Sequence, residues 1–187
     1  SDIRGGSGAG NTGGAVGIGV GFTNADNNVS GLTVVGNTIN NITASTAGYG
    51  SGGRGAYGVL INVGASGSHA GQAISPVVSN NEISVLTGLW AHGVGLEGET
   101  PGAMVLNNKI DGLTGTGGSN GVKIEDNDGA ATVEIHENSF TNLGFGIQNV
   151  MAAVVNATCN WYGTAVPAAV AAQISGPVSY SPFLTNG

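Results

Sequence analysis

Five acidic side chains occupy matching places in two neighbouring repeats of this sequence, and they are the residues best suited to chemistry. They are Glu97, Glu99, Glu125, Asp126 and Asp128. When the two repeats are aligned on their glycines, Glu97 of one lies over Glu125 of the next. Carboxylates about 5 Å apart repel each other unless a cation or a shared proton relieves them. This acidic row therefore needs solvent, a cation or a proton beside it.

Three interpretations of the acidic row stay open, and they follow here from the most to the least favoured. In the first, the charges point into solvent as a row of turn residues that keeps the protein soluble. In the second, the row binds Ca²⁺, which prefers hard oxygen ligands. In the third, two carboxylates at a fixed separation hydrolyse a glycosidic bond.

A second candidate site is the segment Trp90-Ala91-His92. An aromatic face can pack on the C–H groups of a sugar ring, so Trp90 and His92 form a candidate carbohydrate-binding patch. A single Trp at a bend is also common as plain packing. His69, His92 and His136 fall at different phases of the repeat. The sequence therefore predicts no histidine metal site, and we expect each histidine at the surface.

Three N-glycosylation sequons begin at Asn28, Asn41 and Asn156. Because asparagine is so common in this chain, chance matches are expected, and glycosylation stays open. The single cysteine, Cys159, has no flanking His, Lys or Arg that would activate a thiolate. We expect it to be a small core residue.

An asparagine recurs in five copies of one short phrase, as in the segments 34–39, 78–83 and 105–110. The copies are 44, 27, 30 and 22 residues apart, a range typical of a solenoid whose loops vary in length. Asparagine tolerates left-handed backbone angles, and amides stacked at about 4.8 Å can form a continuous internal row. A solvent-facing, sugar-binding strip is the alternative, but the neighbouring isoleucines favour a structural ladder. Its predicted rungs are Asn37, Asn81, Asn108, Asn138 and Asn160.

A second phrase falls between the asparagines and supplies the strands that must position these residues. It occurs as Tyr57-Gly58-Val59-Leu60-Ile61 and as His92-Gly93-Val94-Gly95-Leu96, with later copies at 120–124 and 145–148. Its apolar residues alternate as in a strand, while Gly and Asn interrupt nearly every window of helical length. The two phrases together predict an all-β protein built as one β-solenoid of about six coils.

Composition fits this prediction and excludes several classes. The chain has 187 residues, 36 of them glycine without a triplet period, so it is not collagen. With 40% hydrophobic and 8% charged residues it is too apolar to be disordered. A net charge of −7, without a basic stripe, argues against nucleic acid and anionic membrane surfaces. No apolar run approaches the roughly 18 to 20 residues that cross a bilayer, so we expect no membrane insertion.

The sequence divides into three parts. Residues 1–14 form a Gly-rich leading segment, residues 15–163 hold the repeats, and residues 164–187 form a C-terminal cap. Small-residue insertions at 44–56 and 64–73 are expected to project as loops. Within the cap, Pro167 opens the best short-helix signal of the chain, and a strand-like segment follows at 178–184.

The repeats Val-x-x-Asn-x-Ile and Gly-Val-x-Ile resemble those of right-handed parallel β-helix proteins of the pectin-lyase-like superfamily. The tail, residues 157–163 and 176–184, looks like the "Asn-Trp-Trp-Gly … Tyr-Ser-Pro-Trp-Leu" ending of secreted bacterial and archaeal surface proteins. Tyr162 and Phe183 replace two of its tryptophans. The resemblance implies a single right-handed parallel β-helix with a short C-terminal cap, located outside the cell or on its surface.

For activity the resemblance implies less, since the superfamily holds lyases, hydrolases, adhesins and structural modules. Its lyases use an Arg or Lys beside a Ca²⁺ cluster. Here no Arg accompanies the acidic row, Arg54 lies in a distant loop, and Lys123 reaches the face of Glu125 only if the strand is regular. We therefore lean towards a protein that is not an enzyme, with Ca²⁺ as its one possible cofactor.

The expected function is that of a non-enzymatic extracellular structural solenoid, on the cell surface or in a filament. Residues 1–14 offer no amphipathic helix to cover the first coil, and an uncovered solenoid end favours contact with another subunit. Self-association through this end is therefore one expected partnership. The alternatives are a carbohydrate-binding or adhesin module, whose partners are surface glycans, and a polysaccharide-degrading enzyme.

Overall fold

The chain folds as an all-β protein, and every strand pair among the residues that the structure describes is parallel. The computed structural model describes residues 3–4, 14–22, 28–44, 55–63, 71–125 and 132–187. Within these residues there is one short helix, α1 (Pro167–Ala171). Parallel strands need long connections, so each strand pairs with a strand from a neighbouring repeat rather than with its successor in the chain.

The larger sheet has nine strands. They are β1 (Ile3–Arg4), β2 (Ala15–Phe22), β5 (Thr38–Thr43), β6 (Gly55–Val63), β9 (Glu82–Gly98), β11 (Lys109–Glu125), β13 (Ser139–Thr141), β14 (Phe145–Asn149) and β16 (Ile174–Ser175). The long strands β9 and β11 pair along most of their length, while β5 pairs with the first half of β9 and β6 with the second.

The second sheet has six strands, and a third has two. The second sheet contains β4 (Thr33–Val35), β8 (Val77–Ser79), β10 (Met104–Leu106), β12 (Glu134–His136), β15 (Val155–Asn156) and β17 (Val178–Ser179). The third pairs β3 (Val29–Ser30) with β7 (Ala73–Ile74).

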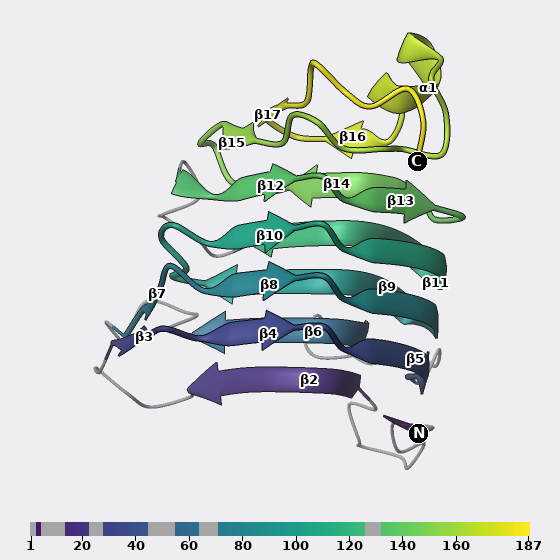
Figure 1. Cartoon of the computed structure of the whole chain (residues 1–187). Helices are drawn as coiled ribbons and strands as arrows, with labels where there is room; N and C mark the ends of the chain where they lie inside the picture. The colour runs from purple at the N-terminus through teal and green to yellow at the C-terminus, as the bar shows by residue number, and fades with distance from the viewer. Residues whose placement is uncertain (1–2, 5–13, 23–27, 45–54, 64–70, 126–131) are drawn as a thin grey trace.

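The chain crosses both sheets once per repeat, so the strands form stacked layers. Layer 1 holds β3 to β6, layer 2 holds β7 to β9, layer 3 holds β10 and β11, and layer 4 holds β12 to β14. Layer 5 holds β15 and β16. Figure 1 shows these layers one above another, with β2 beneath layer 1 and α1 beyond layer 5. The repeat phrases of the sequence therefore correspond to layers.

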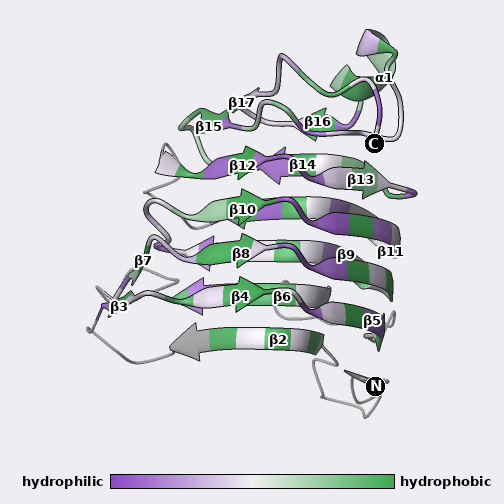
Figure 2. Ribbon diagram, in the orientation of Figure 1, coloured by the Kyte–Doolittle hydropathy of each residue, from purple (hydrophilic) through white to green (hydrophobic). Residues whose placement is uncertain are grey.

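The core is a set of columns that run through the layers between the sheets. One column is Val34, Val78, Val105 and Ile135, and a second is Val59, Val94, Val122 and Ile147. These residues are buried, as strand alternation predicts. Figure 2 shows hydrophilic residues interspersed with apolar ones along the strands.

Each layer bends at a corner just before its ladder asparagine, and the residue there has a left-handed conformation. The corner residues are Gly36, Asn80, Asn107, Glu137 and Cys159, with φ between 52° and 71°. The rungs themselves are not in this conformation. The expectation that the ladder asparagines supply left-handed angles is therefore wrong. The residue before each rung supplies them, because the chain must reverse direction before the amide can point inward.

A second left-handed corner interrupts the long strands of the larger sheet. It is formed in successive layers by Asn41, Val85, Gly112 and Asn142, with φ between 52° and 67°. Beyond this corner, Gly93 illustrates why glycine recurs in the second phrase. A Cβ on Gly93 would lie 2.6 Å from the carbonyl oxygen of Gly121 in the next layer. Successive backbones pass too closely there for any side chain.

The C-terminal segment lies over layer 5. The helix α1 begins at Pro167, as predicted, but it ends at Ala171, and Ile174 begins β16 instead of extending the helix. Of the strand expected over residues 178–184, only Val178–Ser179 forms β17, which pairs with β15. Val170 of α1 is fully buried, so the helix contributes to the core.

Candidate functional site

The five ladder asparagines lie in one column, joined by hydrogen bonds between successive layers. The side-chain Nδ2 of each donates to the Oδ1 of the next, at 3.0 Å from Asn37 to Asn81 and 2.9 Å from Asn81 to Asn108. The next two links, at 2.9 and 3.0 Å, reach Asn138 and Asn160. The backbone N–H of each donor asparagine points to the same oxygen. All amides therefore face the same way, and the ladder has a direction.

Each rung above the first also binds the layer beneath it. The Nδ2 of Asn108 donates to the carbonyl oxygen of Val78 at 2.9 Å, and that of Asn138 donates to Val105 at 2.8 Å. These two rungs are 1 to 2% exposed, so unpaired amides there would be costly. The buried position of the four upper rungs is that of structural groups, and it gives a sugar no access to them.

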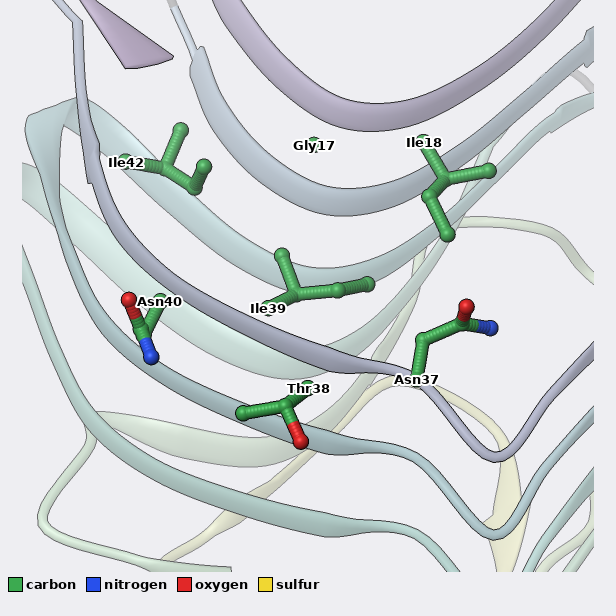
Figure 3. Close-up of a pocket in the computed structure, with 7 residues that line it drawn as sticks. All are labelled: Gly17, Ile18, Asn37, Thr38, Ile39, Asn40 and Ile42. Carbon is green, nitrogen blue, oxygen red and sulfur yellow. The ribbon is translucent and has the colours of Figure 1, made fainter. Parts of the chain in front are cut away.

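The first rung, Asn37, differs from the others because no described residue occupies the ladder position beneath it. Its Oδ1 receives no hydrogen bond from a described residue, and its Nδ2 turns to the carbonyl oxygen of Val35 at 3.2 Å. Asn37 borders a cavity of about 180 Å³ that is also lined by Gly17, Ile18, Thr38, Ile39, Asn40 and Ile42. Figure 3 shows these side chains around the space, with the Asn37 amide at its rim.

The predicted acidic row is partly assembled on the outer face of the larger sheet. Glu97 and Glu125 occupy paired positions on β9 and β11. Glu97 accepts a hydrogen bond from the Tyr57 hydroxyl at 2.7 Å and another from the Asn62 amide at 2.9 Å. The Nζ of Lys123 lies 2.8 Å from Glu125 Oε2. Neither acid therefore faces solvent alone. Lys123 neutralises Glu125, and the neutral donors Tyr57 and Asn62 bind Glu97.

Burial raises the pKa of the Glu97 carboxyl, and the charge of Glu125 and its hydrogen bond add to this rise, while the Tyr57 hydroxyl and Lys123 oppose it. Burial, with the charge of Glu97, also raises the pKa of the Tyr57 phenol. Glu97 therefore retains a proton more readily than an isolated carboxyl would. Proton sharing between neighbouring carboxylates, one of the reliefs expected for this row, is what this geometry favours.

The remaining predicted metal ligands lie only partly within the described residues. Asp126 and Asp128 lie outside the described residues, and Glu99 follows β9 at a bend. Among the residues that the structure describes, no group of three His, Cys, Asp or Glu side chains could hold a metal ion. Ca²⁺ binding thus stays a prediction.

Trp90 and His92 do not form one exposed patch. Trp90 is 42% exposed, with its ring against Gly117 and Gly118 of the next layer, but His92 is only 1% exposed. The Nδ1 of His92 lies 3.0 Å from the Asn120 amide, and burial, with the charge of Lys123, lowers the pKa of His92 to about 3. The expectation of a surface histidine is therefore wrong for His92.

His69 and Arg54 lie outside the described residues. Of the sequon asparagines, Asn41 is exposed at a left-handed corner, whereas the Nδ2 of Asn156 donates to Glu134 at 2.7 Å. The Oδ1 of Asn28 accepts from the backbone of Gln72. Glycosylation at these three positions stays a prediction.

Sequence reasoning missed the neutral partners of the cluster: Tyr57, Asn62 and Asn120. Tyr57 lies directly over His92, with ring centroids 5.0 Å apart, and its ring covers Gly95. Asn120 continues that row and donates to Gln148 at 3.1 Å. The register of the second phrase already places Tyr57, His92 and Asn120 in one column, so this signal was available. No pattern in the sequence indicated that the Tyr57 hydroxyl would bond to Glu97, which lies five residues beyond His92 on the next strand.

No known protein family matches this chain, and neither does any curated protein or any solved structure. Among the described residues, no helix has the length and apolarity needed to cross a membrane. What the fold itself establishes is an all-β protein with stacked parallel sheets. The superfamily and the tail motif remain expectations from the sequence.

Proposed function

We propose that this chain is a right-handed parallel β-helix with a structural, non-enzymatic role outside the cell or on its surface. The layers are its coils, and α1 and the segment after it form the cap. The observation that carries the proposal is the directed asparagine ladder, which binds all five layers from within.

The outer polar cluster supports the same role, because its members bind one another. Both carboxylate oxygens of Glu97 have donors, and Glu125 has Lys123. His92 is buried and neutral, so it offers no proton at physiological pH. A catalytic acid or base must reach the substrate atom on which it acts. These contacts instead tie β6, β9 and β11 together across the sheet.

Two measurements test this proposal together. Immunogold labelling of source cells is expected to place the protein at the cell surface or in extracellular material. The purified chain is expected to leave a panel of acidic and neutral polysaccharides intact over long incubation. Cleavage that is lost in Glu97→Gln or Glu125→Gln would replace the structural role with an enzymatic one, and labelling confined to the cytoplasm would also contradict the proposal.

A second function, carbohydrate binding, is favoured by one observation. Trp90 exposes a large aromatic side chain beside Gly117 and Gly118, where no side chain hides its edge. On a glycan array, we expect any specific binding to disappear in Trp90→Ala and to persist in Val85→Ala, a neighbouring exposed apolar residue on the same strand. Binding that survives Trp90→Ala would exclude this patch.

A further inference from the structure

A small polar depression lies on the larger sheet at layers 2 and 3, directly after their ladder asparagines. It has a volume of about 140 Å³ and is lined by Glu82, Ile83, Ser84, Lys109 and Asp111. In the strand register, Glu82 pairs with Lys109 and Ser84 with Asp111. In Figure 1 these parts of β9 and β11 lie between β5 and β13, so described layers flank the depression on both sides.

The polar groups around this depression are left without partners from the protein. Glu82 and Lys109 carry opposite charges at paired positions, yet neither forms an ion pair with a described residue. Lys123 and Glu125, by contrast, are in contact at 2.8 Å. The Ser84 hydroxyl likewise has no hydrogen-bond partner among the described residues. The donors and acceptors that line the depression are therefore available to a ligand.

Asp111 is the one group of this site that the protein holds in place. Its Oδ1 accepts from Thr141 Oγ1 at 2.6 Å and from Asn142 Nδ2 at 2.8 Å, both in layer 4. These two hydrogen bonds, and to a smaller extent the charge of Lys109, lower the pKa of Asp111, so the carboxylate is ionised at physiological pH. Its Oδ2 accepts from no described side chain. Asp111 thus offers a ligand one fixed, charged acceptor.

The chemistry of the depression fits hydroxyl groups better than ions. A hydroxyl both donates and accepts, so a polyol can donate to Asp111 and Glu82 while it accepts from Lys109. A cation would meet the ammonium of Lys109, and an anion would meet two carboxylates. The four polar positions form a rectangle of about 4.8 by 6.6 Å, set by the strand spacing and the rise per two residues. Pockets for drug-sized ligands begin at roughly 300 Å³, so this smaller volume suits a single ring.

We propose that this depression binds one neutral sugar unit. One hydroxyl of a vicinal pair donates to Asp111 Oδ2, and its neighbour bonds to the Ser84 hydroxyl. The Nζ of Lys109 donates to an oxygen on the other side of the ring, next to Glu82. This inference goes beyond the proposed structural role and does not depend on it, and the site is separate from Trp90. It gives the solenoid a glycan contact on the outside of layers 2 and 3.

The test is an NMR titration of the intact protein with methyl glucoside, methyl galactoside and methyl mannoside. We expect saturable amide shifts at residues 82–84 and 109–111 with at least one of them, with half-saturation at about 1 to 10 mM. The matched probes are the forms of that sugar with an amine or a carboxylate at C6. The carboxylate form is expected to bind at least about threefold more weakly, and the amine form no more tightly than the neutral sugar.

Two results would overturn the inference. The site is excluded if none of the three neutral sugars shifts these residues up to about 100 mM. The ligand class is wrong if either charged form binds more tightly than the neutral sugar, since the depression would then be an ion site.

Protein variants locate the contact. Asp111→Asn is expected to weaken binding at least about tenfold, because a charged acceptor is replaced by a neutral one. The matched control is Glu137→Gln, which removes the same charge from an exposed corner outside the depression and is expected to leave binding unchanged. If Asp111→Asn does not fold, Ser84→Ala is expected to weaken binding about threefold. Equal binding by the altered site and the control would contradict the assignment.

The proposed functions and this inference fail separately. Sugar-induced shifts that disappear in Trp90→Ala would move the contact to Trp90 and overturn the site described here. Absence of all shifts removes the sugar site but leaves surface location and the absence of polysaccharide cleavage unaffected. Polysaccharide cleavage lost in Glu97→Gln removes the structural role whatever binds beside Asp111.

Discussion

Val85 occupies a backbone conformation that its side chain opposes. Its φ is 56°, in the left-handed region, where a β-branched residue is a steric outlier. The same corner in neighbouring layers is occupied by Asn41, Gly112 and Asn142, all residue types that tolerate this region. The stacked register imposes the corner on layer 2 even though its residue disfavours it. Strain at one residue is outweighed by the pairing of the strands around it.

We expect Val85→Asn to raise the free energy of unfolding by about 1 kcal/mol. Left-handed angles cost a β-branched residue roughly 1 to 2 kcal/mol, and asparagine tolerates them better. Val85 is 53% exposed, so little apolar burial is lost. The measurement is chemical denaturation. The matched control is Val35→Asn, a 49% exposed valine in β4 outside the left-handed set, which is expected to bring no gain. Equal effects of the two substitutions would show that the backbone strain is not relieved.

Glu97 links stability to pH. Because its pKa is raised on folding, the folded protein binds this proton more tightly than the unfolded chain does. Its contribution is fully present below the unfolded pKa, near 4.5, and is lost as pH rises through the higher folded value. The groups that face it are Tyr57, Asn62, Lys123 and Glu125.

His92, whose pKa is lowered on folding to about 3, contributes stability that grows as pH rises towards 6.5 and so opposes Glu97. We therefore expect the melting temperature of Glu97→Gln to rise more steeply, or fall less, than that of the unaltered protein between about pH 4.5 and neutrality. The control is Glu82→Gln, an exposed glutamate on the same strand, which is expected to keep the unaltered slope. A Glu97→Gln profile parallel to that of the unaltered protein would mean that another group causes the dependence.

At the scale of the elements, the strands of the six-stranded sheet are too short to be stable by themselves, and the ladder compensates for this. The strands β4, β8, β10 and β12 have three residues each. Each is followed directly by a left-handed corner and a rung, and the rungs after β8, β10 and β12 bind the layers on both sides. The ladder thus continues the sheet through a corner where ordinary strand pairing stops.

We expect Asn108→Ala, in the middle of the ladder, to cost about 3 kcal/mol, because the amide of Asn81 and the carbonyl of Val78 lose buried partners worth about 1 kcal/mol or more each. Asn37→Ala, at the open end, is expected to cost about 1 kcal/mol, since one link to layer 2 is lost. Denaturant unfolding measures both. Similar costs at the two positions would contradict a ladder that is stabilised by neighbours on both sides.

At the scale of the whole molecule, the two ends are unequal. Beyond layer 5 lie β17, α1 and the tail, with Val170 fully buried, whereas β4 is the terminal strand of the six-stranded sheet among the described residues. In a stack where each layer contacts only its neighbours, an edge layer opens with the smallest loss of contacts.

Native-state hydrogen exchange is expected to follow this asymmetry. Amides of β8 and β10 are expected to exchange slowest, and those of β4 fastest among the strands of the six-stranded sheet. Uniform protection from β4 to β12 would show instead that the protein opens as a single unit.

The sequence by itself determined the parts of this protein that repeat. The spacing of Asn37, Asn81 and Asn108, and the alternation around Gly93, predicted parallel layers and the pairing of Glu97 with Glu125. These follow from periodicity, because a residue that returns once per layer must meet its equivalent in the next.

Only the tertiary structure decided what happens across layers and beyond the repeat. It placed His92 inside the protein, because the Tyr57 ring and the Asn120 amide cover it from two neighbouring strands. It moved the left-handed angle from each rung to the residue before it, because the backbone must turn before the amide can enter the core. It also gave the ladder its direction, with each amide nitrogen donating towards Asn160. Direction depends on which atom of each amide meets the next layer, and a pattern of residue types carries no such information.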